Sequence, residues 1–148
     1  MARLLCAALV ALLLSTSSST AQTPLPVVYV LSTGGTIAGQ GSSATDLSNY
    51  KPGTILGEQL VKAVPQIAQI ATVKVEQIAN VGSSDITIEH WLTLSKRIQK
   101  ILTEDPGVAG FVITHGTNTL EETAYFLNLT VRSDKLSSSS ARCGRPQR

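Results

Sequence analysis

Two short segments place hydroxyl side chains beside glycines, and each follows an apolar run. The first is STGGTIAGQG, residues 32–41, and the second is THGTNTLEET, residues 114–123. A threonine hydroxyl is a weak nucleophile at neutral pH and needs a neighbouring base or a hydrogen-bond relay. If the two segments meet, Thr36 and Thr117 supply two hydroxyls from distant parts of the chain to one site.

The pair Gly34–Gly35 suits a tight exit from a strand. Glycine tolerates positive φ and lets a ligand approach the main chain, whose amides can hold an oxyanion. Phosphate-binding patterns do not fit, because there is no Gly-Lys-Ser/Thr for a P-loop and the glycines at 35, 39 and 41 lack the dinucleotide spacing. A tight turn without a ligand is the alternative interpretation.

The order of elements predicts where these segments lie. Runs rich in β-branched residues predict strands at 27–32, 73–81 and 108–114. Helical patterns between and after them make this an α/β domain with a parallel sheet and right-handed crossovers. In a sheet of order 2-1-3 the first and third strands are neighbours, and ligands bind at the carboxyl ends of such strands. We therefore expect Thr36 and Thr117 to converge.

Three helices are predicted. The first repeats apolar residues at a spacing of four and stops before Pro65, and the second carries two stripes along its length. The third follows Thr119, with Glu122 three residues later as in a capping box. The stripes are Leu56, Leu60 and Val64 in the first; Ile88, Leu92, Ser95 and Gln99 against Trp91, Leu94, Ile98 and Ile101 in the second; and Leu120, Thr123, Ala124, Leu127 and Val131, expected to be buried, in the third.

The N-terminus has the features of a secretory signal peptide over residues 1–21: an early cation, an apolar stretch over 4–14, and small residues at Ser19 and Ala21. The stretch is shorter than the roughly 20 residues that span a bilayer. We expect a secreted or periplasmic protein with no membrane contact after cleavage. Cleavage leaves Cys143 as the only thiol, which excludes an internal disulfide.

Charge and histidine content argue against several partners. The formal net charge is +2, yet between residues 22 and 131 six lysines and arginines face nine acidic residues. The basic excess lies at the ends of the chain without interleaved aromatic residues, so nucleic acid is not an expected partner. Neither histidine has a cysteine partner nearby, so no metal site is expected. We expect His115 to hold its turn and His90 to lie on the surface of its helix.

Taken together, STGGTIAGQGSSATDLSNY, NVGSSDI, FVITHGTNTLEETAYFLNLTV and the leader resemble the bacterial secreted (type II) L-asparaginases and glutaminase-asparaginases, over residues 25–135. The resemblance implies the N-terminal portion of a flavodoxin-like parallel-sheet asparaginase domain, incomplete here. It implies hydrolysis of L-asparagine, and in some members L-glutamine, to the acid and ammonia through a threonine acyl-enzyme. It implies no cofactor, and a homotetramer for full-length members.

The resemblance also assigns roles to matching residues. Thr36 matches the nucleophile, and Thr117 matches the second catalytic threonine. Tyr50 matches a tyrosine on a flexible flap that closes over the substrate and helps to activate the nucleophile. The Gly- and Ser-rich composition of the stretch that ends at Tyr50 suits a mobile lid.

Three more residues match positions that contact the substrate. Ser83 matches the serine that binds the α-carboxylate, and Ser84 occupies a contacting position that is often glutamine. Asn118 departs from the family, which usually places aspartate there to pair with the α-ammonium group. An amide keeps the hydrogen bond and loses the charge, which predicts weaker binding of the amino acid.

The chain departs from the family after Lys135. The family continues with a sequence close to Lys-Pro-Val-Val-Val-Val-Gly-Ala-Met-Arg-Pro. GTC valine codons that are read one base later become TCG codons for serine, as in residues 137–140. The codons that follow, read in the same shifted frame, encode Ala-Arg-Cys-Gly-Arg, as in residues 141–145. We expect a signal peptide over 1–21, a partial asparaginase domain over 22–135, and a frameshifted, disordered tail over 136–148. A genuine serine-rich linker is the alternative.

A truncated domain has physical consequences. The third strand should have an uncovered edge, which favours association. A lysine and a partner subunit's glutamate that the resemblance implies for the site have no counterpart among the 148 residues. We expect poor folding and little or no hydrolase activity. A non-enzymatic small-ligand-binding α/β module and an inert truncated gene product are the alternative functions.

Overall fold

The computed structural model describes residues 23–41 and 50–133, and the backbone of 137–140. The predicted signal peptide, most of the predicted lid and most of the tail lie outside these residues. Within the described ranges, no helix has the length and apolar character needed to cross a membrane.

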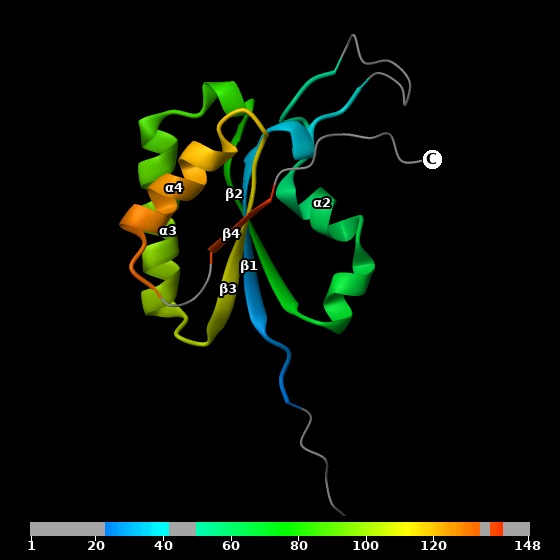
Figure 1. The fold of residues 1–148 in the computed structure, drawn as a ribbon. Coiled ribbons are helices and arrows are strands. Elements are labelled where there is room, and N and C mark those ends of the chain that lie inside the picture. Colours follow the sequence, from blue (N-terminus) through cyan, green and yellow to red (C-terminus); the bar gives the residue numbers. More distant parts are fainter. Residues whose placement is uncertain (1–22, 42–49, 134–136, 141–148) are drawn as a thin grey trace, which may run out of the picture.

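Parallel strands form one sheet in the order β2-β1-β3-β4 (Figure 1). β1 spans Val27–Gly34, β2 spans Thr72–Val81 and β3 spans Val108–Thr114. β1 lies between β2 and β3 and pairs in parallel with both. The predicted α/β class, the three strands and their order 2-1-3 are confirmed.

β4, Ser137–Ser140, departs from the prediction. Its backbone pairs in parallel with β3, from Phe111 opposite Ser137 to Thr114 opposite Ser140. The main-chain N–H and C=O groups of an edge strand can pair with a neighbouring extended segment largely irrespective of its side chains. The expectations of an uncovered edge on β3 and of a tail without structure are therefore wrong at these four residues.

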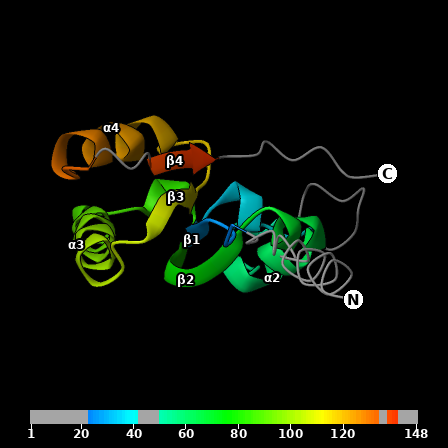
Figure 2. The same cartoon turned by 90° about the horizontal axis from the view of Figure 1, so that it is seen from below.

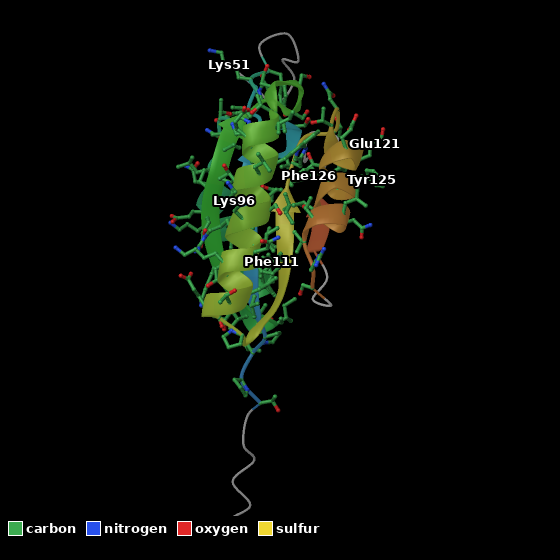
Figure 3. The ribbon with its side chains drawn as sticks, turned by 90° about the vertical axis from the view of Figure 1, so that its left-hand side faces the viewer. Lys51, Lys96, Phe111, Glu121, Tyr125 and Phe126 are labelled. Atoms are coloured by element: carbon green, nitrogen blue, oxygen red, sulfur yellow. The ribbon has the colours of Figure 1, made fainter. Side chains whose placement is uncertain are left out.

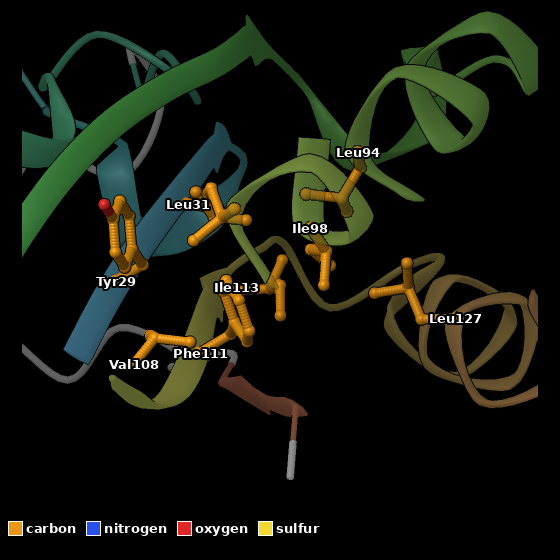
Figure 4. Packing of buried hydrophobic residues seen from close by; sticks show 9 residues of the cluster. Tyr29, Leu31, Leu94, Ile98, Val108, Phe111, Ile113 and Leu127 are labelled. Carbon is orange, nitrogen blue, oxygen red and sulfur yellow. The ribbon is translucent and has the colours of Figure 1, made fainter. Parts of the chain in front are cut away.

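The main core lies between the sheet and α3, Ile88–Glu104, together with α4, Leu120–Thr130. These two helices lie on one side of the sheet and α2 lies on the other (Figures 1 and 2). Burying each large aliphatic side chain contributes about 1.5–3 kcal/mol. The buried cluster, shown in Figure 4, consists of Tyr29, Leu31, Leu94, Ile98, Ile101, Val108, Phe111, Ile113 and Leu127.

The two stripes predicted for α3 have different environments. Leu94, Ile98 and Ile101 are buried, whereas Ile88 and Leu92 are exposed. The helix starts at a capping box in which the Thr87 N–H donates to Nδ1 of His90 at 3.0 Å. His90 was predicted as a surface residue of this helix, and the structure adds a capping role that satisfies one unpaired amide.

α2, Gly57–Lys62, is shorter than predicted and is followed by the 3-10 helix η2, Pro65–Gln69. Leu56 and Val64, predicted on its apolar stripe, are exposed. The helix approaches the sheet through Gly57 instead, because a Cβ there would lie 2.7 Å from Cβ of Ser32. Leu60, the remaining residue of that stripe, is half-buried, so the close approach at Gly57, rather than a continuous apolar stripe, docks this helix.

Ion pairs join the edge strand β2 to its neighbours. Arg97 of α3 donates from Nε and Nη2 to the Glu76 carboxylate, both at 2.6 Å, and these bonds lower the pKa of Glu76. Lys74 donates to Asp105 at 2.8 Å and to the Tyr29 hydroxyl at 3.2 Å. The bond from Lys74 lowers the pKa of Asp105, and the same bond raises the pKa of Lys74.

Candidate active site

The ends of β1 and β3 touch through two glycines. Gly35 has φ 74° and Gly34 has φ 93°, values that favour glycine. A Cβ on Gly35 would overlap the main chain of Gly116, so the two backbones are in direct contact. Thr36 follows the first glycine and Thr117 follows the second. The contact therefore brings the two predicted threonines to neighbouring strand ends.

Ser83 joins this contact from the end of β2. It begins η3, a 3-10 turn over Ser83–Asp85, and is buried with 6% of its surface exposed. A Cβ on Gly116 would lie 2.5 Å from Oγ of Ser83 and 3.0 Å from Cα of Gly35. The ends of all three strands β1, β2 and β3 thus meet within a few ångströms.

The turn after β3 is fastened to Ser83 by two hydrogen bonds. The Asn118 N–H donates to Oγ of Ser83 at 3.3 Å, and the Thr119 hydroxyl donates to the Ser83 carbonyl at 2.6 Å. Thr119 is the N-cap of α4, but no side-chain cap is formed. The predicted capping box at Thr119 and Glu122 is therefore wrong, because the hydroxyl is used to hold the neighbouring strand end.

Exposed polar side chains lie next to this turn and are linked by hydrogen bonds. The Asn118 side-chain amide donates from Nδ2 to Oγ of Ser84 at 2.7 Å. The Thr117 hydroxyl donates to Oδ1 of Asn118 at 3.5 Å. Thr117, Asn118 and Ser84 are all exposed, so their remaining hydrogen-bonding capacity faces solvent. The predicted site residues on this side are Ser83, Ser84, Thr117 and Asn118, and all four side chains are electrically neutral.

Tyr50 reaches Thr36 from the other side. Its hydroxyl donates to the main-chain carbonyl of Thr36. The same carbonyl accepts the Gly39 N–H at 3.2 Å, which closes η1, the 3-10 turn over Thr36–Ala38. The structure places Tyr50 beside Thr36, and the contact that it records is to the backbone of Thr36, not to its hydroxyl.

Thr36 and Thr117 are brought close by the main-chain contact of Gly35 with Gly116, and within the described residues no hydrogen bond joins their two hydroxyls. The Gly35 amide donates to the Val81 carbonyl at 2.8 Å, so it is occupied by β2 and not directed at a ligand. The idea that this glycine amide holds an oxyanion is therefore not supported by its geometry. Residues 42–49 of the predicted lid lie outside the described residues.

A buried polar chain behind the site was not predicted from sequence. Nε1 of Trp91 donates to Oγ1 of Thr123 at 2.7 Å, Thr123 lies 2.9 Å from Nε2 of His115, and Nδ1 of His115 lies 2.8 Å from the Gly116 carbonyl. Tryptophan only donates and a carbonyl only accepts, so Thr123 donates to Nε2 and His115 carries its proton on Nδ1. His115, fully buried, thus holds the turn at Gly116 as expected.

Thr123 could have been found from one signal. It is the polar residue in a stripe that otherwise consists of apolar residues, and a buried hydroxyl requires a partner. The indole that supplies the bond also stacks on Phe126 of α4, with ring centroids 5.4 Å apart. Phe126 faces α3, whereas Tyr125 points outward from α4 (Figure 3).

The described residues include no cluster of three or more His, Cys, Asp or Glu side chains that could hold a metal ion. The site is therefore a set of hydroxyl and amide groups at three strand ends. Such groups can bind a small polar ligand by hydrogen bonds and, if one hydroxyl is activated, attack a carbonyl carbon.

Comparison with known proteins shows the family to which the chain belongs. Residues 27–136 match the family described as "Asparaginase, N-terminal". The chain belongs to the asparaginase family. It is 57% identical over 111 residues to L-asparaginase 2 of Escherichia coli (strain K12), covering 75% of this chain and 31% of that protein. It is 52% identical over 121 residues to L-asparaginase 2 of Bacillus subtilis (strain 168), covering 82% of this chain and 32% of that protein.

A solved asparaginase structure has the same fold. The crystal structure of a probable cytoplasmic L-asparaginase from Campylobacter jejuni superimposes with a TM-score of 0.73 at 50% identity, covering 77% of this chain and 34% of that protein. This asparaginase chain thus spans about a third of the length of the relatives that it matches. Its described residues correspond to the N-terminal part of the family's domain.

Proposed function

We propose that residues 23–133 form the N-terminal part of the active site of an L-asparaginase, which hydrolyses the side-chain amide of L-asparagine to L-aspartate and ammonia. The observation that carries the proposal is the main-chain contact of Gly35 with Gly116, which sets Thr36 and Thr117 at adjacent strand ends. Two threonines held at neighbouring strand ends by a main-chain contact suit a nucleophile and a proton relay.

In the proposed reaction the Thr36 hydroxyl attacks the side-chain carbonyl carbon of asparagine. The C–N bond breaks, and the nitrogen leaves as ammonia after accepting the proton from the hydroxyl, with Thr117 as the relay. Water then attacks the ester on Thr36 and releases L-aspartate and the free threonine hydroxyl. Tyr50 holds the backbone of Thr36 through the carbonyl bond, which fixes the nucleophile's position.

The other end of the substrate lies, in this proposal, against the end of β2. Ser83 is buried at the junction of the three strand ends and contributes a hydroxyl to the α-carboxylate. Ser84 and Asn118 are linked to each other and contribute neutral hydrogen bonds near the α-ammonium group. Neutral partners bind an ion less strongly than charged partners do. L-glutamine, longer by one methylene, is a second candidate substrate.

The proposed activity is that of a longer protein, because the chain spans about a third of its relatives. For the 148-residue chain alone we propose little or no ammonia release, and for the full-length protein a homotetramer exported by the predicted signal peptide. The proposed frameshift at codon 136 is tested by the gene sequence, in which codons 137–140 must be of the TCG type.

A chimera tests the proposed site. Residues 23–133 replace the matching segment of L-asparaginase 2 of Escherichia coli, with which this chain is 57% identical, and ammonia release from L-asparagine is measured. We expect activity that is lost in the Thr36→Val variant and retained in Thr103→Val, which changes an exposed threonine of α3. Labelling by an asparagine diazoketone, located by peptide mass spectrometry, should fall on Thr36.

Two outcomes would contradict the proposal. An active chimera whose Thr36→Val variant hydrolyses asparagine at the same rate would exclude Thr36 as the nucleophile. Asparagine binding without label and without dependence on Thr36 would favour the non-enzymatic ligand-binding module.

A further inference from the structure

The glycine at position 39 has no backbone reason to be glycine. Gly39 follows η1 with φ −90° and ψ 152°, an extended conformation that any residue adopts. This distinguishes it from Gly34 and Gly35, whose positive φ values require glycine. The absence of a side chain at this position must therefore make room for a neighbouring group.

That neighbour is Tyr50. A Cβ on Gly39 would overlap the hydroxyl oxygen of Tyr50 and the ring carbons next to it. The ring is in this place because its hydroxyl bonds the Thr36 carbonyl, the atom that also accepts the Gly39 N–H. One carbonyl thus receives both donors, and the ring lies over the residue that supplies one of them.

The backbone on both sides of this contact is fixed. Gln40 and Lys51 exchange two main-chain hydrogen bonds, each 3.0 Å long. The N–H groups of Thr54 and Ile55 both donate to the Ala38 carbonyl, at 2.7 and 2.8 Å. A side chain at position 39 could not be accommodated by a small shift of either segment, so the ring itself would have to leave.

We infer that Gly39 is a positioning residue, whose missing side chain lets Tyr50 lie against it and hold the backbone of Thr36. The packing part of this inference concerns described residues only and does not depend on the reaction. Its consequence for rate rests on the proposed function, in which Thr36 is the nucleophile.

A double-mutant cycle tests the packing. Denaturant unfolding of the 148-residue chain is followed by the fluorescence of Trp91, the only tryptophan. Gly39→Ala should lower the folding equilibrium constant roughly five- to a hundredfold in the natural background, because it overpacks the site. In the Tyr50→Ala background the same change should raise that constant about two- to fivefold, because alanine restricts the unfolded chain.

Gly107→Ala is the matched control, since a Cβ there meets only Oδ1 of Asp105, at an ordinary 3.5 Å. Its effect should be the same with Tyr50 or Ala at position 50. If Gly39→Ala has the same effect in both backgrounds, the inference is overturned, whatever the activity of the protein.

The chimera gives a second readout if the chain alone is too unstable to measure. Gly39→Ala should lower kcat to the level of Tyr50→Ala, and the double variant should be no slower than Tyr50→Ala. Multiplying effects in the double variant would overturn the inference while leaving Thr36 as the nucleophile. If the Thr36→Val variant of the chimera keeps full activity, the proposed function is contradicted. The double-mutant cycle on stability then still tests the packing of Tyr50 against Gly39.

Discussion

Asn118 donates its side-chain amide to the hydroxyl of Ser84 at 2.7 Å, which fixes Oδ1 on the side of Thr117. An amide held in this orientation offers a substrate ammonium group one neutral acceptor. This arrangement makes position 118 a test of how the proposed site recognises the amino-acid end of its substrate.

Asn118→Asp should strengthen substrate binding in the chimera. A carboxylate supplies a charge-assisted bond to the ammonium group, and the gain over a neutral bond is about 1 kcal/mol. We expect KM for asparagine to fall roughly fivefold with little change in kcat. Asn128→Asp, an exposed change on α4, is the control. An unchanged or higher KM would show that the substrate's ammonium group does not lie at this position.

The contact between strand ends predicts a strong effect of Gly116→Ala. The added methyl group would lie 2.5 Å from Oγ of Ser83 and 3.0 Å from Cα of Gly35, so one of the strand ends must move. Overpacking of this kind costs about 1–3 kcal/mol of stability. In the chimera, kcat/KM of the Gly116→Ala variant should be lower than that of the unchanged chimera even at a temperature where both proteins are fully folded. Equal activity at a temperature where both proteins are folded would show that this contact does not position the site.

The buried chain behind the site predicts a cost for Thr123→Val. Valine has nearly the shape of threonine, but it leaves Nε1 of Trp91 and Nε2 of His115 without their partner. Unsatisfied buried polar groups cost about 1–3 kcal/mol. Denaturant unfolding should show this loss, and Thr123→Ser should recover most of it. Thr103→Val, exposed on α3, should change stability by less than about 0.5 kcal/mol.

The sequence predicts most of the sheet because strands, helices and their order follow from local patterns. The three strand ranges and the place of β1 between β2 and β3 were expected. Tertiary partners were not predictable in the same way. Thr119 has the sequence of a helix cap, yet its hydroxyl bonds the Ser83 carbonyl, because only the folded chain brings that carbonyl within 2.6 Å.

The candidate site shows the same division. Motif order and sheet topology predicted that Thr36 and Thr117 belong to neighbouring strand ends, whereas the atoms that make contact were not predictable. Tyr50 contacts the Thr36 carbonyl, and Gly35 uses its amide for the Val81 carbonyl. β4 pairs through main-chain groups, which every residue has, so its four serines carry no strand signal of their own.

The ion pair between β2 and α3 predicts how stability depends on pH. Two hydrogen bonds from Arg97 lower the pKa of Glu76 below its ordinary value of 4.5. The unfolded chain therefore takes up this proton at a higher pH than the folded chain does. The stabilisation is fully present above the unfolded pKa of Glu76 and is lost as pH falls through the lower folded pKa. Asp105, whose pKa Lys74 lowers, acts in the same direction.

Glu76→Gln isolates this contribution. For the natural chain, the free energy of unfolding should change little between pH 7 and about pH 5. It should then fall as pH decreases further, because the carboxylates become protonated in the unfolded state first. The variant should be less stable than the natural chain at pH 7, and the difference should shrink toward pH 3. Glu58→Gln removes an exposed pair with Lys62 at 3.6 Å and should change stability little at any pH, since such pairs are weak. A constant difference between Glu76→Gln and the natural chain from pH 7 to pH 3 would mean that the Arg97 pair does not contribute to the acid sensitivity of the fold.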